Sequence, residues 1–215
     1  MSSDTASSQS PDVSEQMQVR LDKRARIIAD GGQAYPVDLL RDHTLVQVRQ
    51  KYTDDTGELT LAPGEETTDE VTVGGRVVFV RNTGKLCFAS LQDGFTETSN
   101  GERLQIMLSK AEVGDESLAA WKSDVDLGDH VWVRGRVVVS RRGELSIMAA
   151  EWRMASKALR PLPTLHKELS EETRVRRRYA DLVVREESRQ MVRTRAVITR
   201  AVRRALDERG FLEIE

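Results

Sequence analysis

The residue types that carry most enzyme chemistry are sparse in this sequence. Its three histidines, His43, His130 and His166, lie far apart, and Cys87 is its single cysteine. No HxxH, CxxC or paired-carboxylate spacing indicates a metal site. The sequence also has neither a GxxxxGKS/T phosphate loop nor a GxSxG nucleophile motif. We therefore expect no metal site and no catalytic residues within the chain.

A second set of residue types points to nucleic acid. In LCFASLQ, in RLQIML and at the start of ELSIMAAEWRM, every second residue is small or aliphatic. If these residues face the inside of a sheet, Phe88, Gln105 and Glu144 share its outer face. A ring there can stack on an unpaired base, while an amide and a carboxylate can hydrogen-bond to its edge. Arg81, at the end of another strand, could hold a phosphate or a base carbonyl. The pattern alone leaves open that Phe88 packs under a helix and Gln105 is only solvated.

A sheet must position these side chains, and the sequence predicts one. Five segments read as strands, VTVGGRVVFVRN, LCFASLQ, RLQIML, HVWVRGRVVVS and ELSIMAAEWRM, with one helical segment, KAEVGDESLAAWKSD, between the third and fourth. Gly74 and Gly75 predict a bulge or bend in the first strand. The element order is typical of the OB fold, a five-stranded barrel that binds oligonucleotides or oligosaccharides. A generic small sandwich is the alternative, and either makes the chain mainly β.

The flanking sequence divides into parts of different character. The acidic stretch before Val71 reads as a loop, and FLEIE, after the expected helix Arg185–Arg209 and its terminal Gly210, reads as the start of a strand. The predicted parts are a disordered tail (1–14), an N-terminal helical extension (15–70), the barrel (71–160), a basic linker or hinge (161–180) and the truncated start of another domain (181–215).

Composition excludes several classes of protein. Lysine and arginine number 33 against 35 acidic residues, a net charge of −2, which excludes a polybasic nucleic-acid coat. One cysteine excludes a disulfide framework. No apolar run approaches the ~18 residues of a membrane span, and the first residues lack the features of a signal peptide. The sequence therefore predicts a cytoplasmic protein with no membrane partner.

Specific stretches resemble a known family. DKRARIIADGGQAYPV, RDHT, GKLCFASLQDG, GELSI, KALRPLP and RVRRRYADLVVREESRQMVRTRAVITRAVRRALDERGFLEIE are similar to the N-terminal part of class II lysyl-tRNA synthetases, particularly the actinobacterial type. The resemblance covers about residues 20–215. It implies that the barrel binds the anticodon of tRNA(Lys) and that the chain continues into the α+β catalytic domain of a class II synthetase.

The resemblance also implies roles for individual residues. Phe88 falls at the position that stacks on the central uridine of the anticodon, and Gln105 at the position that pairs with that base. Arg81 and Glu144 fall at further anticodon-contacting positions. The basic hinge could face the tRNA, although a solvated basic stretch is the alternative; its members are Arg174, Arg176, Arg177 and Arg178. The final segment resembles the first class II motif, which forms the dimer interface, with an apolar stripe of Met191, Ile198, Val202 and Ala205.

The resemblance implies that the full enzyme uses ATP with Mg²⁺ to attach lysine to tRNA and works as a homodimer. The second and third motifs, which bind ATP and lysine, are absent from this sequence. We therefore expect the chain by itself to bind no cofactor and to be inactive as a ligase. The alternatives are a free-standing OB module for single-stranded nucleic acid, the corresponding part of an Asp or Asn synthetase, and the synthetase module of a lipid-lysylating membrane protein. RDHT, GELSI and KALRPLP favour lysine.

Overall fold

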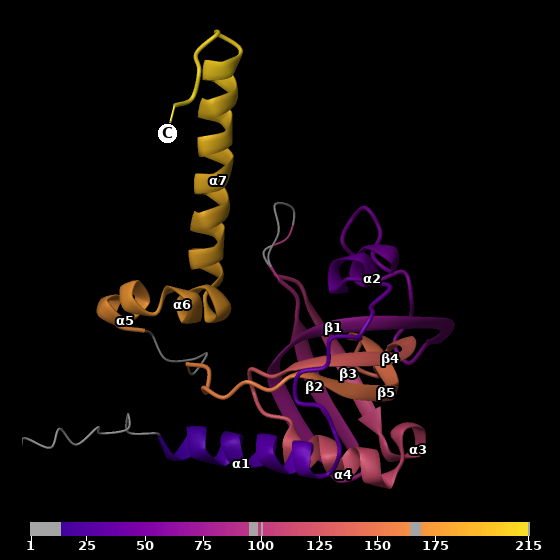
Figure 1. The fold of residues 1–215 in the computed structure, drawn as a ribbon. Coiled ribbons are helices and arrows are strands. Elements are labelled where there is room, and N and C mark those ends of the chain that lie inside the picture. Colours follow the sequence, from indigo (N-terminus) through magenta and orange to yellow (C-terminus); the bar gives the residue numbers. More distant parts are fainter. Residues whose placement is uncertain (1–13, 95–98, 100, 164–168, 215) are drawn as a thin grey trace, which may run out of the picture.

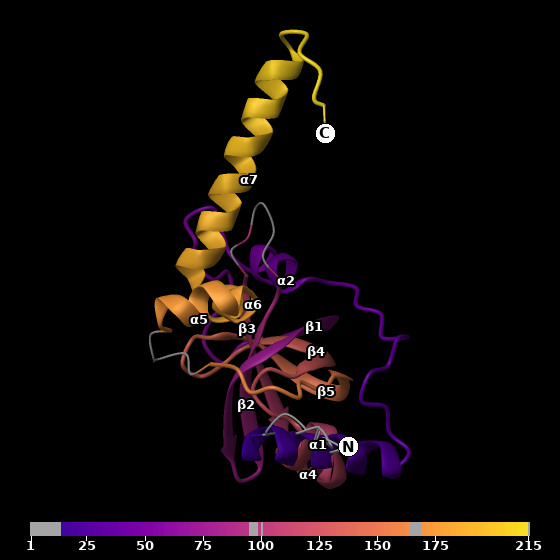
Figure 2. The same cartoon turned by 60° about the vertical axis from the view of Figure 1, so that its left-hand side comes forward.

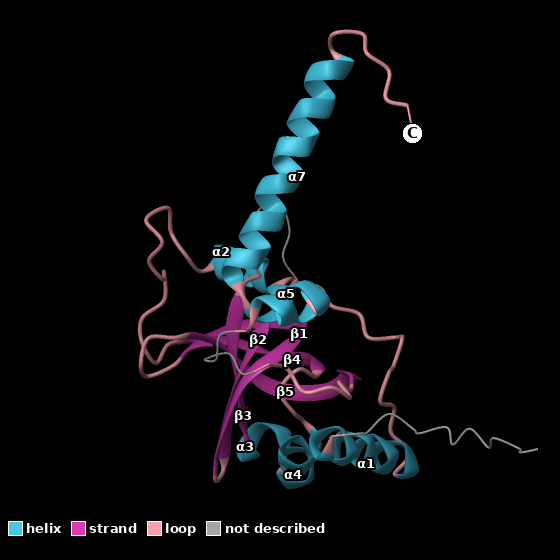
Figure 3. Ribbon diagram, turned by 90° about the vertical axis from the view of Figure 1, so that its left-hand side faces the viewer, coloured by secondary structure: helices cyan, strands magenta, loops and turns pink. Residues whose placement is uncertain are grey.

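A computed structural model describes residues 14–94, 99, 101–163 and 169–214 of the chain. The tail expected at residues 1–14 lies almost wholly outside the described residues, as does His166. Helices gather at two opposite ends of a central barrel (Figure 3).

Five strands form the barrel (Figure 1). They are β1 (Glu66–Thr83), β2 (Leu86–Gln92), β3 (Arg103–Ser109), β4 (His130–Val139) and β5 (Leu145–Ser156). The sheet closes in the order β1-β2-β3-β5-β4, and the pairing of β3 with β5 is parallel while the others are antiparallel. The predicted OB-fold barrel, mainly β, is confirmed.

The alternation in the sequence builds the barrel core. The inward residues of β2, Cys87, Ala89 and Leu91, are at most 1% exposed. Gly135 in β4 allows β5 to approach closely, because a Cβ built there would lie 2.1 Å from the carbonyl oxygen of Met148. The core therefore excludes any larger residue at position 135 unless the strands move apart.

The first strand differs from its prediction in two ways. Its register shifts between Val77 and Phe79, whereas the expected bulge at Gly74 and Gly75 is absent and both glycines stay in regular pairing with β4. The strand also begins at Glu66, five residues earlier than expected, so the prediction of an acidic loop there is wrong at its end. Arginines of β4 offset the acidic charge across the pair, with Arg136 3.2 Å from Glu66.

Short helices cover both ends of the barrel. They are α1 (Glu15–Ala29), α2 (Leu45–Lys51), α3 (Lys110–Val113) and α4 (Asp115–Asp124). The helical segment expected between the third and fourth strands is split into α3 and α4 at Gly114, whose φ of +81° interrupts a helix. Trp121 of α4 is 1% exposed, and its ring meets that of Trp152 edge to face at 5.1 Å, which anchors α4 against the barrel.

The segment expected to be a linker is partly helical. It holds α5 (Glu171–Arg176) and the start of α6 (Arg178–Val184), before α7 (Glu186–Asp207). Ser170 caps α5, and Arg178 and Arg185 pair with the fully buried carboxylate of Asp181 at 3.2 and 3.3 Å. These contacts stabilise helices α5 and α6 in a region where the sequence alone predicted a basic linker.

The long helix α7 extends away from the barrel (Figure 2). It agrees with the predicted helix, and Gly210 follows it with a φ of +79°. The strand expected at FLEIE is not formed in residues 211–214, which pair with no strand in the described part of the chain. A strand needs a neighbour to satisfy its backbone groups, and local alternation cannot supply one.

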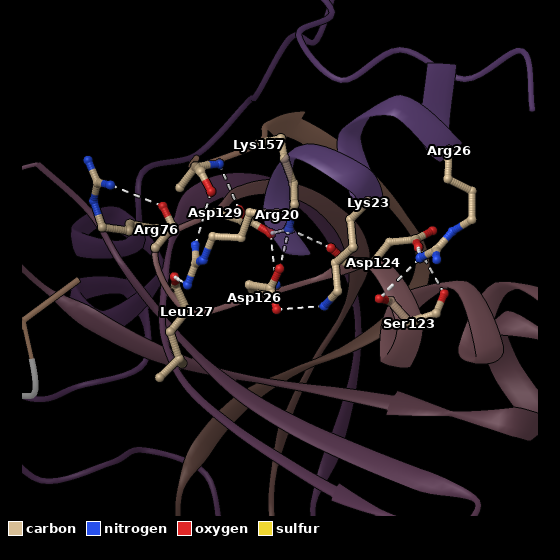
Figure 4. A network of polar contacts seen from close by, with 12 residues as sticks. Arg20, Lys23, Arg26, Arg76, Ser123, Asp124, Asp126, Leu127, Asp129 and Lys157 are labelled. Carbon is tan, nitrogen blue, oxygen red and sulfur yellow. Dashed lines mark hydrogen bonds and ion pairs between the residues drawn. The ribbon is translucent and has the colours of Figure 1, made fainter. Parts of the chain in front are cut away.

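A buried ionic cluster fastens α1 to the barrel (Figure 4). The ammonium of Lys157, just after β5, lies 2.6 Å from Asp126 and 2.7 Å from Asp129, and the Lys157 and Asp129 side chains are fully buried. Lys23 of α1 reaches Asp126 at 2.7 Å. Burial raises the pKa of Asp126, but hydrogen bonds from Lys157 and Lys23 outweigh this and hold that pKa below its ordinary value.

We predict that Lys157→Ala destabilises the chain by about 3–5 kcal/mol, because it leaves the buried carboxylate of Asp129 without its cation. Urea unfolding measures the change. The matched control is Arg153→Ala, which removes an exposed partner of Glu151 and should cost no more than about 1 kcal/mol. Equal losses in the two variants would contradict the assigned role of the cluster.

Candidate nucleic-acid interface

The four residues singled out from the outer-face pattern lie in one cleft. This open cleft has a volume of about 1240 Å³ and is lined by Arg81 of β1, Phe88 of β2, Gln105 of β3 and Glu144 before β5. These residues span more than 60 positions of sequence, so the barrel alone brings them together. Phe88 and Gln105 are half-buried, and the inward neighbours of each are fully buried.

An arginine lies against the aromatic ring of the cleft. Arg81 and Phe88 are cross-strand partners, and the guanidinium carbon of Arg81 lies 4.7 Å from the centroid of the Phe88 ring. A cation over the ring is electrostatically favourable and holds the arginine at the cleft. A base stacked on Phe88 would therefore have a positive charge close by, suited to a phosphate or a base carbonyl.

The cleft holds a second aromatic residue that the sequence analysis missed. Phe79 is 53% exposed and lines the same cleft. Counting alternate residues from Val73 and Val77 would place Phe79 inside the barrel. The register shift buries both Val77 and Val78 and turns Phe79 and Arg81 outward. The sequence shows an aromatic residue in this strand, but whether Phe79 faces inward or outward depends on the bulge.

Arg49 of α2 lies close to two carboxylates of the cleft. Its Nε lies 2.7 Å from the Glu102 carboxylate, and its Nη2 lies 3.8 Å from that of Glu144 and donates to the carbonyl of Arg103 at 2.7 Å. Nothing in the sequence near α2 marks Arg49, because its partners are more than 50 residues away. The two carboxylates are therefore partly neutralised from outside the barrel.

The side-chain amide of Gln105 is hydrogen-bonded to a buried serine. Its Nε2 donates to the hydroxyl of Ser146 at 2.8 Å, and that hydroxyl donates to the carbonyl of Glu144 at 2.9 Å. Basic residues form the rim, with Arg141 and Arg142 exposed in the turn between β4 and β5 and Arg103 exposed at the start of β3. The arrangement offers a stacking ring, an oriented amide and a cationic rim, which are the elements of single-strand recognition.

The arginines of the expected hinge do not join this cleft. Arg174 and Arg178 point to the buried carboxylate of Asp181, at 3.9 and 3.2 Å, and Arg176 pairs with Glu172 at 3.0 Å. None of them, nor Arg177, lines the cleft. Their contact with tRNA stays a prediction, and the observed contacts stabilise α5 and α6.

The expected apolar stripe lies on the free face of α7. Met191, Ile198 and Val202 are 61, 58 and 53% exposed, and Ala205 is half-buried. Met191 and Ile198 also line a shallow groove along the helix. Side chains this apolar and this exposed form the kind of patch that proteins use for association. Their role in a dimer stays a prediction.

Within the described part of the chain, the remaining titratable residues form no group of the kind that holds a metal ion. Across residues 14–94, 99, 101–163 and 169–214, no group of three or more His, Cys, Asp or Glu side chains could hold a metal ion. His43 contacts Asp42 at 2.7 Å. Burial, with a smaller effect of Arg76, lowers the pKa of His130 to about 4, so His130 is neutral at pH 7.

Two family models match the chain. Residues 71–155 match the family described as an OB-fold nucleic acid binding domain, and residues 170–215 match the family described as class II tRNA synthetases (D, K and N). These matches fall on the barrel with its cleft and on helices α5–α7.

Curated proteins with two different names are similar to this chain. A lysine–tRNA ligase of Kineococcus radiotolerans is 60% identical over 95% of this chain and 39% of its own length. One of Mycobacterium tuberculosis is 53% identical over 98% of this chain and 40% of its own length. The lysylphosphatidylglycerol biosynthesis bifunctional protein LysX of Rhodococcus jostii is 38% identical over 94% of this chain and 16% of its own length. The chain thus spans about two fifths of the length of the ligases that it matches.

We predict that replacing both Arg141 and Arg142 by alanine weakens binding of single-stranded RNA and lowers its salt dependence. Each lost phosphate contact should reduce the slope of log affinity against log salt by about 0.7. Titration at several salt concentrations measures this slope. The matched control, Arg153→Ala with Arg160→Ala, removes two arginines outside the cleft and should keep the original slope. An unchanged slope in the Arg141/Arg142 variant would show that these two arginines do not contact the RNA phosphates.

Proposed function

Over the part that it shares with its relatives, this chain belongs to the family of class II lysyl-tRNA synthetases, and we propose that its barrel binds the anticodon of tRNA(Lys). The carrying observation is that Arg81, Phe88, Gln105 and Glu144 converge in one open cleft. The ring stacks on the central uridine, and the amide of Gln105 pairs with the Watson–Crick edge of that base.

Electrostatics supports the same proposal. The net charge of −2 would disfavour RNA if it were spread evenly over the surface. In the cleft, Arg49 offsets Glu102 and Glu144, while Arg103, Arg141 and Arg142 remain at the rim. Phosphates of the anticodon loop are thus attracted locally, and base contacts supply selectivity.

The proposal extends to the whole protein at the level of its family. Lysine–tRNA ligation with ATP and Mg²⁺, in a cytoplasmic homodimer, is proposed for the longer protein type that the relatives represent. The role proposed for this chain's own residues is recognition of the anticodon loop, because Arg81, Phe88, Gln105 and Glu144 line one cleft. The exposed stripe of α7 is proposed as a dimer contact, where a second copy would cover Met191, Ile198 and Val202. Among the described helices, none has the length and apolarity needed to cross a membrane.

A free-standing OB module for single-stranded nucleic acid is less well supported. Such a module would account for the barrel and its cleft, but not for helices α5–α7 and their match to class II synthetases. An Asp- or Asn-type synthetase is also less well supported, because the relatives at 53–60% identity carry the name lysine–tRNA ligase.

We predict that Phe88→Ala binds an anticodon stem-loop with the sequence UUU about 5–150-fold more weakly, since stacking on an aromatic ring contributes about 1–3 kcal/mol per base. Gln105→Ala should instead lose most of the preference for this stem-loop over one with a central C. Fluorescence titration of the 215-residue chain measures both affinities.

Phe211→Ala is the control for the loss of a ring, because Phe211 is 61% exposed and lies after α7, away from the cleft. It should bind both stem-loops as the unmodified chain does. If folded Phe88→Ala and Gln105→Ala variants also bind both RNAs unchanged, the cleft is not the anticodon site.

A further inference from the structure

We infer that Ser146 is a positioning residue that makes the cleft selective for uridine over cytidine at the base read by Gln105. The inference rests on the proposed function, because it concerns how that same cleft distinguishes bases. It assigns a role to a residue that cannot touch the RNA itself, since Ser146 is 0% exposed.

The polarity of the contact follows from the hydrogen bonds. The carbonyl of Glu144 can only accept, so the Ser146 hydroxyl, 2.9 Å away, must donate its one hydrogen there. The same hydroxyl can then only accept from Gln105 at 2.8 Å, which requires the NH₂ group of the amide on that side. The Gln105 carbonyl oxygen therefore points away from Ser146.

The backbone fixes both ends of this chain of hydrogen bonds. Gln105 and Ser146 are register partners in the parallel pairing of β3 with β5. The Glu144 carbonyl also accepts from the backbone N–H of Ser140 at 2.8 Å, across the turn between β4 and β5. The acceptor that sets the polarity therefore belongs to the backbone of the turn that leads into β5, and it does not depend on the RNA.

A fixed amide distinguishes two bases that a rotating amide cannot. Uracil offers a donor at N3 and an acceptor at O4, whereas cytosine offers an acceptor at N3 and a donor at N4. An amide with its oxygen at N3 and its nitrogen at position 4 pairs with uracil and opposes like groups on cytosine. A 180° rotation of the amide reverses this, so a free amide would accept either base. Ser146 prevents that rotation.

Stem-loop titrations with the 215-residue chain test this role. The unmodified chain should favour a central U over a central C by roughly 5–150-fold, the discrimination expected of a good bidentate base contact. Ser146→Ala should reduce this ratio to about threefold or less, mainly by improving binding of the C stem-loop. Ser146→Cys, whose thiol is a weak hydrogen-bonding group, should fall between the two and serves if the alanine variant does not fold.

Two comparisons separate positioning from general damage. Ser156→Ala removes a half-buried hydroxyl from the same strand, β5, at a position outside the cleft, and it should keep the full ratio. In a Gln105→Ala background, Ser146→Ala should change the ratio no further, because the amide it holds is gone.

The outcomes distinguish the two levels of the argument. No U preference in the unmodified chain overturns the proposed anticodon role and the inference with it. A U preference that survives folded Ser146→Ala overturns the inference alone. The inference is supported if the preference is lost in Ser146→Ala, is kept in Ser156→Ala and falls no further when Ser146→Ala is added to Gln105→Ala.

Discussion

The rest of the structure depends on the parallel pairing of β3 with β5. Three register pairs, Gln105 with Ser146, Ile106 with Ile147 and Met107 with Met148, close the barrel. Parallel neighbours cannot be joined by a tight turn, so the chain between them must cross over, which it does through α3, α4 and β4. The crossover buries Trp121, and the closure brings the Gln105 amide within hydrogen-bond distance of the Ser146 hydroxyl. The pair of Gln105 with Ser146 thus belongs both to the closure of the barrel and to the proposed recognition of RNA.

Local patterns in the sequence were informative where the strands are regular. Alternation in β2 and β3 predicted the outer face for Phe88 and Gln105, because these two strands keep one face buried. In β5 the alternation fails at its start, where Leu145, Ser146 and Ile147 are all buried. The face of Phe79 could not be assigned, since one extra residue in β1 reverses the alternation. Arg49 could not be found either, because its relation to Glu102 and Glu144 exists only after α2 packs beside the barrel.

The helices beyond the barrel were harder to predict for an electrostatic reason. A run of arginines reads as solvated chain unless a buried acid organises it, and the burial of Asp181 is a property of the folded state. The same holds for Lys157, whose ammonium would ordinarily be exposed but lies between two aspartates. Buried charges therefore organise both regions, through local pairs at Asp181 and through pairs 31 and 28 positions apart at Lys157.

The hydrogen bonds between α1 and the segments that flank the barrel strands affect how homologous sequences can diverge. Arg20 donates to two main-chain carbonyls, those of Leu127 at 2.9 Å and Ala158 at 3.0 Å, and to no partner side chain among these contacts. Positions 127 and 158 can therefore change their side chains during evolution without breaking the contact, whereas a change at Arg20 removes both bonds at once. Only position 20 is constrained by this contact. A search for correlated substitutions between homologues would therefore miss it, although it joins parts of the chain more than 100 residues apart.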